Sequence, residues 1–301
     1  MKPHNGAAPP GVMTAPESPF TIIDKAVLSP TVARFTVHAP FIARKRKPGN
    51  FVIIRLCETG ERVPLTIVDG DERSGTITLI VQGVGKSTKE LLSKSAGDVI
   101  QDVVGPLGNP TPIGEFGSVA CVGGGVGTAE LFPIAKALKE KGNSLYTVIG
   151  ARTKELLILE EEMAECSNGL MVTTDDGSCG RKGIVTGPLK DLLDAPLGIA
   201  AVYAIGPLPM MKGVAELTAK YGVKTFVSLN AIMVDGTGMC GGCRVSVGGQ
   251  MKFACVDGPE FDGHRVDFDE LIMRNRTFGD LERLANLARD FGRKESCHGL
   301  R

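Results

Sequence analysis

Cysteine spacing is the strongest chemical signal in this sequence. Cys240 and Cys243 form a Cys-x2-Cys pair, Cys255 follows after eleven residues, and Asp235 precedes Cys240 with four residues between them. Plant-type [2Fe-2S] loops run Cys-x4-Cys-x2-Cys, with a distant fourth cysteine. This stretch has that spacing with Asp in the first place, and its glycines let the backbone wrap closely around a small inorganic core. The pattern predicts one [2Fe-2S] cluster, held by Asp235, Cys240, Cys243 and Cys255.

Three other interpretations use the same residues. A structural Zn site also takes Cys-x2-Cys with a third ligand. A redox-active thiol pair needs Cys-x2-Cys alone. A buried trio of cysteines with no ligand is the plainest alternative, but two cysteines among four glycines (236, 238, 241 and 242) make a poor core.

Composition excludes several classes of function. Lys+Arg and Asp+Glu number 34 each, so no basic surface predicts nucleic acid as a partner. No apolar run approaches the roughly 20 residues that span a bilayer, so we expect no membrane partner. The length of 301 residues predicts about two domains. Clustered cysteines in a chain this long indicate metal ligation in a reducing compartment, and hence a cytoplasmic protein.

The two ends of the sequence carry weaker signals. Residues 1–19 are rich in proline and lack the apolar region of a signal peptide, so we expect a disordered tail. Residues 276–301 hold an apolar stripe at helical spacing, from Leu281 to Phe291. We expect this C-terminal helix to pack on its own domain, with docking on a partner as the alternative. Cys297 is expected to be a free thiol.

The pattern of residues 20–112 predicts an antiparallel β-barrel. Short β-rich runs, at 20–28, 32–38, 51–56, 63–68 and 76–82, are separated by Gly, Pro and Asp clusters. One notable segment, Arg62-Val63-Pro64-Leu65-Thr66, places a cation and a hydroxyl at a strand start.

A second segment of the barrel, Gly83 to Thr88, opens a short helix. It ends like a Walker A motif, but the position that requires the first glycine is Ile80, so the P-loop interpretation fails. A glycine turn that opens a helix suits any phosphate group. A plain strand–turn–helix without a ligand is the alternative.

The pattern of residues 113–228 predicts a doubly wound nucleotide-binding domain. The buried strand 118–122 leads into Gly123-Gly124-Gly125-Val126-Gly127-Thr128 and then an apolar-periodic helix. That geometry lays a pyrophosphate on a helix N-terminus. Further strands at 144–149, 170–173 and 200–205 alternate with helical segments near 153–166, 186–194 and 209–221. Each strand ends in a Gly- or Asp-bearing loop, where open α/β sheets bind ligands, although ordinary tight turns would look the same.

The order of barrel, Gly-rich α/β domain and cysteine loop resembles the ferredoxin–NADP reductase superfamily over residues 20–228. With the cysteine loop, it looks like the dihydroorotate dehydrogenase electron-transfer subunits. It looks still more like the family of small (alpha) subunits of NADH-dependent ferredoxin:NADP oxidoreductases, also described as sulfide dehydrogenase subunits. The match extends over residues 20–275. Its most specific part is VDGTGMCGGCRVSVGGQMKFACVDGPEFDGH, where Asp235 replaces the first cysteine.

The resemblance implies roles for particular residues. The flavin, FAD, would lie on two segments of the barrel: Arg62, Pro64, Leu65 and Thr66 at the ring and phosphates, and Gly85, Lys86, Ser87 and Thr88 at the pyrophosphate. NAD(H) or NADP(H) would lie on the glycine loop and three later loops: Gly123, Gly124, Gly125, Val126, Gly127 and Thr128, then Gly150 and Arg152, Asp175 and Asp176, and Gly206, Pro207 and Met210. Members of the superfamily often have Cys-Gly-Pro beside the nicotinamide. Because Ile205-Gly206-Pro207 stands here, we expect no thiol in hydride transfer, and no residue is assigned a catalytic role.

The resemblance also implies a function. Hydride passes between NAD(H) and FAD, and single electrons pass to the [2Fe-2S] cluster, which accepts one at a time. The chain would be the small subunit of an electron-bifurcating complex beside a larger flavin and iron–sulfur subunit, with ferredoxin reached through the complex. The alternatives are the electron-transfer subunit of a dihydroorotate dehydrogenase and a non-catalytic Zn-stabilised binding module. The implied division is a tail at 1–19, an FAD domain at 20–112, an NAD(P) domain at 113–228, a cluster domain at 229–275 and a helix at 276–301.

Overall fold

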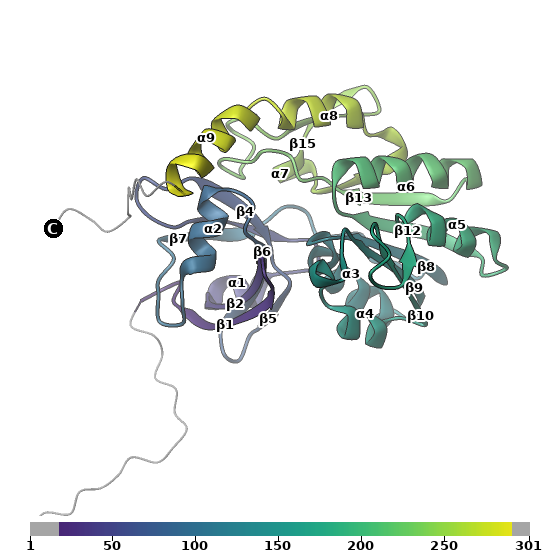
Figure 1. The fold of residues 1–301 in the computed structure, drawn as a ribbon, viewed down its shortest axis with the longest axis horizontal. Helices are drawn as coiled ribbons and strands as arrows, with labels where there is room; N and C mark the ends of the chain where they lie inside the picture. The colour runs from purple at the N-terminus through teal and green to yellow at the C-terminus, as the bar shows by residue number, and fades with distance from the viewer. Residues whose placement is uncertain (1–17, 291–301) are drawn as a thin grey trace, which may run out of the picture.

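The computed structural model of this chain describes residues 18–290. Nearly all of the expected tail, together with Phe291 and Cys297, lies outside these residues. Three groups of elements make up the described part, and Figure 1 shows them as a barrel, an α/β layer and a smaller unit that lies above both.

The first group is the predicted antiparallel barrel, made of two sheets. One sheet has the order β1-β2-β6-β5 and the other the order β4-β3-β7. Their bounds are β1 (Ile22–Ser29), β2 (Val32–His38), β3 (Phe51–Arg55), β4 (Arg62–Thr66), β5 (Asp69–Asp71), β6 (Thr76–Gln82) and β7 (Asp102–Leu107), with the helices α1 (Pro40–Lys45) and α2 (Lys86–Ser93). Alternating apolar residues of β2 and β6 fill the core, where Phe35, Val37, Ile77 and Leu79 are fully buried.

The second group is the predicted doubly wound domain. Its sheet has the order β11-β10-β9-β8-β12-β13-β16, in which every pairing is parallel except the last. The bounds are β8 (Ser118–Gly124), β9 (Ser144–Ala151), β10 (Gly169–Thr174), β11 (Arg181–Lys182), β12 (Ile199–Ile205), β13 (Lys224–Ser228) and β16 (Glu260–Asp262). Central strands buried on both faces need continuous apolar runs, as Val119 to Val122 shows.

Helices cover both faces of this sheet. Leu131 and Ile134 of α3 (Gly127–Glu140) pack with Met163 of α4 (Glu160–Cys166) on one face. Leu189 of α5 (Thr186–Asp194) packs with Met211 of α6 (Leu208–Tyr221) on the other. A 3-10 turn, η1 (Lys154–Leu156), precedes α4. The predicted helical segments near 153–166, 186–194 and 209–221 are thereby confirmed.

The third group carries the cysteines. It consists of the hairpin β14 (Arg244–Val247) and β15 (Gln250–Phe253), the short helix α7 (Ala254–Asp257) and the turn η2 (Gly263–Arg265). A strand of this segment, β16, pairs antiparallel with β13, so that Val227 faces Phe261. The cysteine-bearing segment therefore completes the edge of the nucleotide-binding sheet, which the sequence did not predict.

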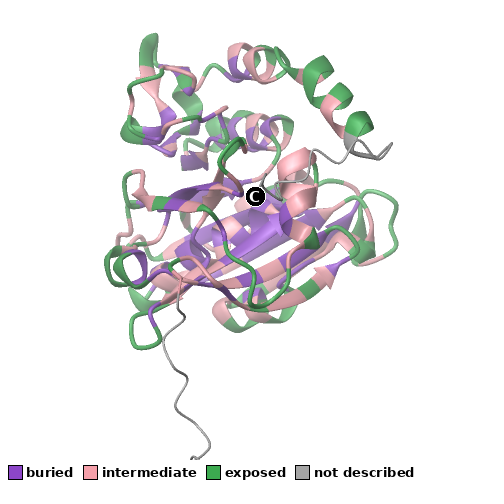
Figure 2. Cartoon of the chain, turned by 90° about the vertical axis from the view of Figure 1, so that its left-hand side faces the viewer, coloured by how far each residue is buried: buried purple, intermediate pink, exposed green. Residues whose placement is uncertain are grey.

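The C-terminal elements correct one expectation. Helix α8 (Phe268–Asn275) packs on the sheet domain through Phe268 and Leu271. Helix α9 (Gly279–Asp290) instead lies beside α2 of the barrel, and Figure 1 shows it reaching back over that domain. The apolar stripe of α9 does not pack on its own domain: Leu281, Leu284 and Leu287 are 63%, 61% and 45% exposed. Figure 2 accordingly shows this helix mostly in the colour of exposed residues. Packing on its own domain was the wrong expectation, because the side of α9 that carries the leucines faces solvent.

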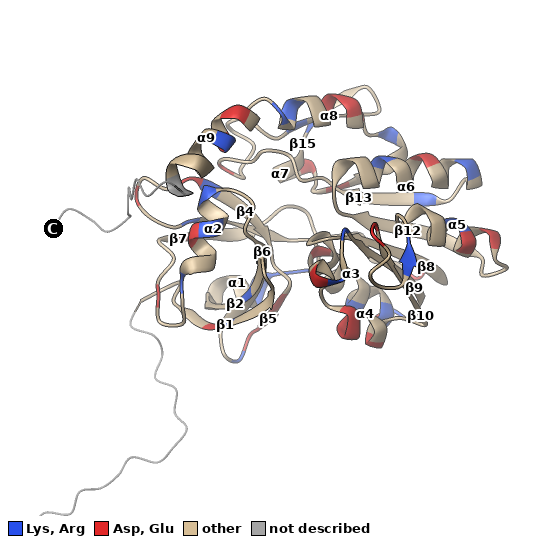
Figure 3. Ribbon diagram, in the orientation of Figure 1, with Lys and Arg blue, Asp and Glu red and all other residues tan. Residues whose placement is uncertain are grey.

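Charges of both signs are spread over the surface, as Figure 3 shows. Asp69 joins the barrel to the sheet domain, because its carboxylate lies 2.6 Å from Arg46 and 3.3 Å from Lys136 of α3. Among residues 18–290, no helix combines the length and the apolar character needed to cross a bilayer.

Candidate functional site

The glycine loop after β8 and the loop after β12 lie against each other. A Cβ on Gly127 would sit 2.5 Å from the carbonyl oxygen of Ile205, and a Cβ on Gly124 would sit 2.4 Å from the sulfur of Met210. Gly127 therefore needs to be glycine, because backbone atoms block a side chain there, whereas a side chain at position 124 would have to displace Met210. In the order β10-β9-β8-β12-β13, the chain reverses direction across the sheet between β8 and β12, which is where open α/β sheets bind their ligands. The structure thus brings together the predicted residues of these two loops.

Gly125 is the open position of the glycine loop. Its φ is +56°, a left-handed conformation that favours glycine, and a Cβ there would meet nothing within 4 Å. Its N–H donates to the carbonyl of Gly150 at 2.8 Å. The loop is therefore held in place while one face stays free for a ligand at the start of α3.

The loops after β9 and β10 are joined by hydrogen bonds. The N–H of Asp175 donates to Ala151 at 3.1 Å, and the N–H of Asp176 donates to Arg152 at 3.3 Å. The pKa of Asp176 is lowered, chiefly because the Ser178 hydroxyl donates to its carboxylate. The predicted residues from Gly150 to Asp176 thus line the same edge of the sheet as the glycine loop.

The barrel places two cations near the predicted flavin segment. Arg62 begins β4 and is exposed, and Lys86 begins α2. Within residues 18–290, neither side chain forms an ion pair or a hydrogen bond with the protein. A Cβ on Gly85 would meet nothing within 4 Å, so the start of α2 is also open. Free cations beside a helix N-terminus suit an anionic ligand such as a pyrophosphate.

The remaining residues of the second flavin segment have local partners. The Thr88 hydroxyl accepts from the N–H groups of Val84 and Gly85, each at 3.0 Å, and so caps α2. The Ser87 hydroxyl donates to the Glu61 carboxylate. Thr88 therefore shapes the turn, while the open surface belongs to Gly85 and Lys86.

The hairpin positions two of the cysteines. Gly248 and Gly249 form its two-residue turn with φ values of +60° and +75°, the conformation that matches strand twist. Arg244 pairs with Phe253, so Cys243 and Cys255 emerge side by side with their sulfurs 3.2 Å apart. Both are 1% exposed, whereas Cys240 lies at the surface.

Asp235 organises the loop before these cysteines. Its carboxylate accepts from the N–H groups of Met239 at 3.1 Å and Cys240 at 2.9 Å. Its pKa is lowered, first of all by a hydrogen bond from the N–H of Thr237. These hydrogen bonds favour the ionised carboxylate and hold it next to Cys240.

The four predicted ligands fall into two pairs, because Cys243 and Cys255 lie side by side and Asp235 lies next to Cys240. Within the described residues, no three His, Cys, Asp or Glu side chains lie close enough together to hold a single metal ion. A [2Fe-2S] core spreads four protein ligands over two irons, and two pairs of donors fit that arrangement.

The cysteine loop rests on the barrel. A Cβ on Gly236 would sit 2.6 Å from Leu107 of β7 and 2.7 Å from Ile53 of β3. Strand β3 also pairs with β4, which carries Arg62 to Thr66. The expected flavin segment and the cysteine loop are therefore separated by a single strand.

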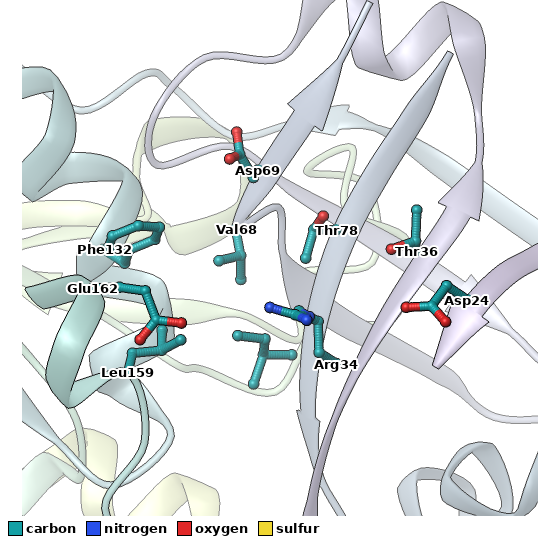
Figure 4. Close-up of a pocket in the computed structure, with 10 residues that line it drawn as sticks. Asp24, Arg34, Thr36, Val68, Asp69, Thr78, Phe132, Leu159 and Glu162 are labelled. Atoms are coloured by element: carbon teal, nitrogen blue, oxygen red, sulfur yellow. The ribbon is translucent and has the colours of Figure 1, made fainter. Parts of the chain in front are cut away.

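A cavity of about 240 Å³ lies elsewhere, between the barrel and the helices α3 and α4. Figure 4 shows Arg34, Thr78 and Val68 of the barrel facing Phe132 and Glu162 across it. None of the predicted cofactor residues lines this cavity. It is part of the interface between the two domains.

Two carboxyl groups near the site were not predicted from the sequence. Glu130 lies in the first turn of α3, and Glu260 lies on β16. Burial raises the pKa of Glu130 to about 7 and that of Glu260 to about 8. Glu260 could not be found from spacing, because its burial depends on the pairing of β16 with β13.

Two family models match parts of the chain. Residues 230–267 match the iron-sulfur cluster binding domain of dihydroorotate dehydrogenase B. Residues 121–216 match the oxidoreductase NAD-binding domain. The chain thus contains an iron–sulfur binding domain and an NAD-binding domain.

Relatives that align with most of the chain are named as electron transfer subunits or a homolog of one. A Thermotoga maritima protein named as a homolog of the electron transfer subunit of dihydroorotate dehydrogenase B (NAD(+)) is 51% identical over 264 residues, covering 88% of this chain and 93% of the relative. The electron transfer subunit from Bacillus caldolyticus is 35% identical, covering 82% of this chain and 97% of its own.

Solved structures show the same fold. A chain from the structure of an NADH-dependent reduced ferredoxin-NADP oxidoreductase, described as giving insights into flavin-based electron bifurcation, superposes with a TM-score of 0.86. It is 49% identical, and the match covers 91% of this chain and 98% of that one. Phthalate dioxygenase reductase superposes with a TM-score of 0.58 at 16% identity, covering 76% of this chain and 85% of that one, which shows the fold alone.

Proposed function

Because this chain belongs to the family of dihydroorotate dehydrogenase B electron transfer subunits and their homologues, we propose that it moves electrons between NADH and an iron–sulfur cluster through FAD. In this proposal it is the small subunit of an electron-bifurcating NADH-dependent ferredoxin:NADP oxidoreductase. The observation that carries the proposal is the placement of the cysteine loop on the barrel, one strand away from the flavin segment.

The residues of this chain position NADH, FAD and the cluster. Gly125 leaves room for the pyrophosphate of NADH at the start of α3, and Gly124 and Gly127 let the loop after β12 approach. Arg62 and Lys86 neutralise the phosphates of FAD. FAD, when bound, supplies the conversion of a hydride into electrons that leave singly, which a [2Fe-2S] cluster requires. Asp235, Cys240, Cys243 and Cys255 hold that cluster, and the hard carboxylate ligand alters its potential relative to a fourth thiolate.

The domain division supports the same assignment. We assign 20–112 to FAD, 113–228 to NAD(H) and 229–275 to the cluster, with β16 crossing back to the NAD(H) sheet. The relatives are named as electron transfer subunits, and we infer that this chain likewise serves a larger flavin and iron–sulfur subunit, through which ferredoxin is reached.

The test uses the full chain purified without oxygen. We expect bound FAD, iron and acid-labile sulfide, and bleaching of the flavin by NADH followed by the electron paramagnetic resonance signal of a reduced [2Fe-2S] cluster. Cys243→Ala should lose the cluster and keep the flavin, while the control Cys179→Ala, outside the loop, should keep both. Zinc in place of iron, or a flavin that stays oxidised under excess NADH with the partner present, would reject the proposal.

A second candidate function rests on the relatives that are themselves dihydroorotate dehydrogenase subunits. In that case the electrons would serve a dihydroorotate-oxidising partner. Isolation of the native complex separates the two candidates. A large flavin and iron–sulfur subunit supports the first, and a dihydroorotate dehydrogenase catalytic subunit supports the second.

A further inference from the structure

Two arginines lie against the glycine turn 241–242, which separates the cysteines of the Cys-x2-Cys pair. A guanidinium nitrogen of Arg274, on α8, lies 3.5 Å from the carbonyl oxygen of Gly242. Arg244, the first residue of β14, folds back over the same turn, because a Cβ on Gly241 would sit 2.9 Å from one of its guanidinium nitrogens. Two positive charges from different elements therefore border the turn between two of the proposed cluster ligands.

Neither arginine is neutralised by a carboxylate of the protein. Within residues 18–290, Arg244 and Arg274 form no ion pair. Glu270 lies four residues before Arg274 on α8, at a spacing that favours an ion pair, and yet the two side chains are not paired. The positive charge of Arg274 is directed at the glycine turn instead.

Arg274 is held in place more firmly than Arg244. Its helix packs on the sheet domain through Phe268 and Leu271, and the Arg274 side chain is half-buried. Helix α8 also lies against β14, which begins directly after Cys243. Arg244 is exposed, so water screens its charge more strongly. We therefore expect Arg274 to have the larger electrostatic effect at the turn.

The turn brings these charges close to a proposed ligand. Gly242 has contacts on both sides: its carbonyl faces Arg274, and its N–H donates to the sulfur of Cys240 at 3.4 Å. Because neither residue of the turn has a side chain, the guanidinium groups can approach the backbone closely. A charge held at the turn therefore acts on the ligand sulfurs at short range.

The charge of the proposed cluster makes these cations relevant to electron transfer. Three thiolates and one carboxylate give a [2Fe-2S] core a net negative charge even when it is oxidised, and reduction adds one more negative charge. A nearby cation stabilises the more negative state by Coulomb attraction. Net charge and hydrogen bonding around a cluster are among the properties that set its reduction potential. Positive charge at the turn therefore favours the reduced state.

We propose that Arg274, assisted by Arg244, raises the reduction potential of the [2Fe-2S] cluster, so that the cluster accepts electrons from the flavin more readily. The proposal rests on the function proposed above. The step concerned moves one electron: the reduced flavin loses it, and one iron of the cluster passes from the ferric to the ferrous state, with no bond formed or broken. Both arginines are positioning residues, which act through the field at the turn and are not ligands.

A redox titration followed by electron paramagnetic resonance tests the proposal on the full chain, loaded with FAD and cluster. In Arg274→Gln, the equilibrium constant for reducing the cluster should fall about tenfold, which is a shift of about 59 mV to lower potential. That is the size expected for the loss of one unit charge at short range in a half-buried site. Arg244→Gln should shift the potential in the same direction by less, and the double variant should have the lowest potential.

Two further variants separate charge from structure. Arg274→Lys keeps the charge without the planar guanidinium and should restore most of the potential, which a purely structural role would not produce. The control Arg276→Gln removes an equal charge two residues along α8, on the opposite side of the helix, and should keep the wild-type potential. Iron, sulfide and flavin content should equal wild type in every variant.

The outcomes are distinct from failure of the proposed function. If wild type holds no iron–sulfur cluster, the proposed function is wrong and this proposal falls with it. If wild type holds a cluster that NADH reduces, and both glutamine variants keep the wild-type potential, the function stands and the role of the arginines is overturned. If Arg274→Gln loses the cluster, Arg274→Lys decides: a potential near wild type supports the role, and a tenfold loss with the charge retained overturns it.

Discussion

At the scale of single residues, Gly125 is the most direct test of the nucleotide site. Gly125→Val puts a branched side chain at a φ of +56°, into the open space where we propose that the pyrophosphate binds. We expect the concentration of NADH needed for half-maximal flavin reduction to rise about tenfold or more, equivalent to ~1.4 kcal/mol of binding.

The matched control is Gly142→Val. Gly142 also has a positive φ, +83°, and open space around its Cβ, but it follows the far end of α3. It should show the same backbone strain without the loss of NADH affinity. Equal effects of the two substitutions would mean that strain, and not a blocked ligand, explains the result.

Arg62 tests the flavin site in the same way. Arg62→Ala removes a cation that has no partner in the described protein, so only the ligand contact is lost. A charge-assisted hydrogen bond is worth ~1.5–3 kcal/mol, which predicts about 10- to 100-fold weaker FAD binding by fluorescence titration. Arg73→Ala, in the exposed β5–β6 turn, is the control and should bind FAD normally. Full flavin occupancy of Arg62→Ala after dilution and desalting would contradict the assignment.

Glu260 predicts a pH dependence of stability. Its pKa is about 8 in the folded chain against an ordinary 4.5, so the fold favours the protonated acid. This contribution is fully present below about pH 4.5 and is lost as pH rises through about 8, so unfolding becomes easier over that range. Glu260 keeps part of its surface accessible, which limits the loss to ~1–2 kcal/mol.

Denaturant unfolding of the flavin-free chain measures this effect. Glu260→Gln should be at least as stable as wild type at pH 8.5, about half a unit above that pKa, and should show a flatter dependence on pH. Glu140→Gln, which changes an exposed carboxylate, should follow the wild-type curve. An unchanged pH dependence in Glu260→Gln would show that this carboxyl is not held in its neutral form.

Much of the candidate site could be proposed at this scale, for identifiable reasons. The spacing of Asp235, Cys240, Cys243 and Cys255 is local, so the sequence alone proposes them as one set of ligands, and the structure places Asp235 next to Cys240 and Cys243 next to Cys255. The same holds for Gly123 to Thr128, because a strand, a glycine turn and a helix occur in one short run. Glu130 and Glu260 were missed, since their burial and raised pKa arise only when three segments far apart in sequence meet.

At the scale of elements, long apolar runs were predictable and short polar ones were not. Strands β8, β9 and β12 followed from their buried Val, Ile and Ala residues. Strand β5, Asp69-Gly70-Asp71, is one of the Gly, Pro and Asp clusters that were expected to separate strands, but pairing with β6 holds it extended. Helix α9 was predicted from the helical spacing of its apolar residues. That spacing does not indicate which surface covers those residues.

The exposed stripe of α9 leads to a prediction about assembly. Leu281, Leu284 and Leu287 face solvent on a helix that lies beside α2 of the barrel, and we infer that they contact the larger subunit proposed above. Leu284→Asp should weaken the complex by ~2 kcal/mol, about 30-fold, as for a central interface residue. The control Val27→Asp changes another exposed apolar residue, 73% accessible, on β1 of the barrel.

Co-purification from the native host, followed by size-exclusion chromatography, provides the measurement. Flavin and iron content of the isolated Leu284→Asp chain should equal wild type, since the side chain supports no core. If Leu284→Asp and wild type assemble equally well, the stripe does not form the interface.

At the scale of the whole molecule, the order of domains was predictable, whereas their interlocking was not. The family models match the NAD-binding and iron–sulfur parts as separate stretches, 121–216 and 230–267. In the structure they share one sheet, because β16 lies beside β13. The end of the barrel is also joined to the cysteine-bearing segment, because the backbone N–H of Asn109, after β7, donates to the carbonyl of Gly258 at 2.7 Å.

Strand β16 has a consequence for any shortened form of the chain. A protein ending near residue 229 would expose the backbone groups of Lys224–Ser228 along a bare sheet edge. Such an edge pairs readily with another copy, so the shortened chain should self-associate at concentrations where full-length protein does not, as light scattering would reveal. A monodisperse shortened chain would contradict this. The segment that carries the proposed metal ligands would thus also keep neighbouring molecules from joining sheet to sheet, and its loss in damaged protein would promote aggregation.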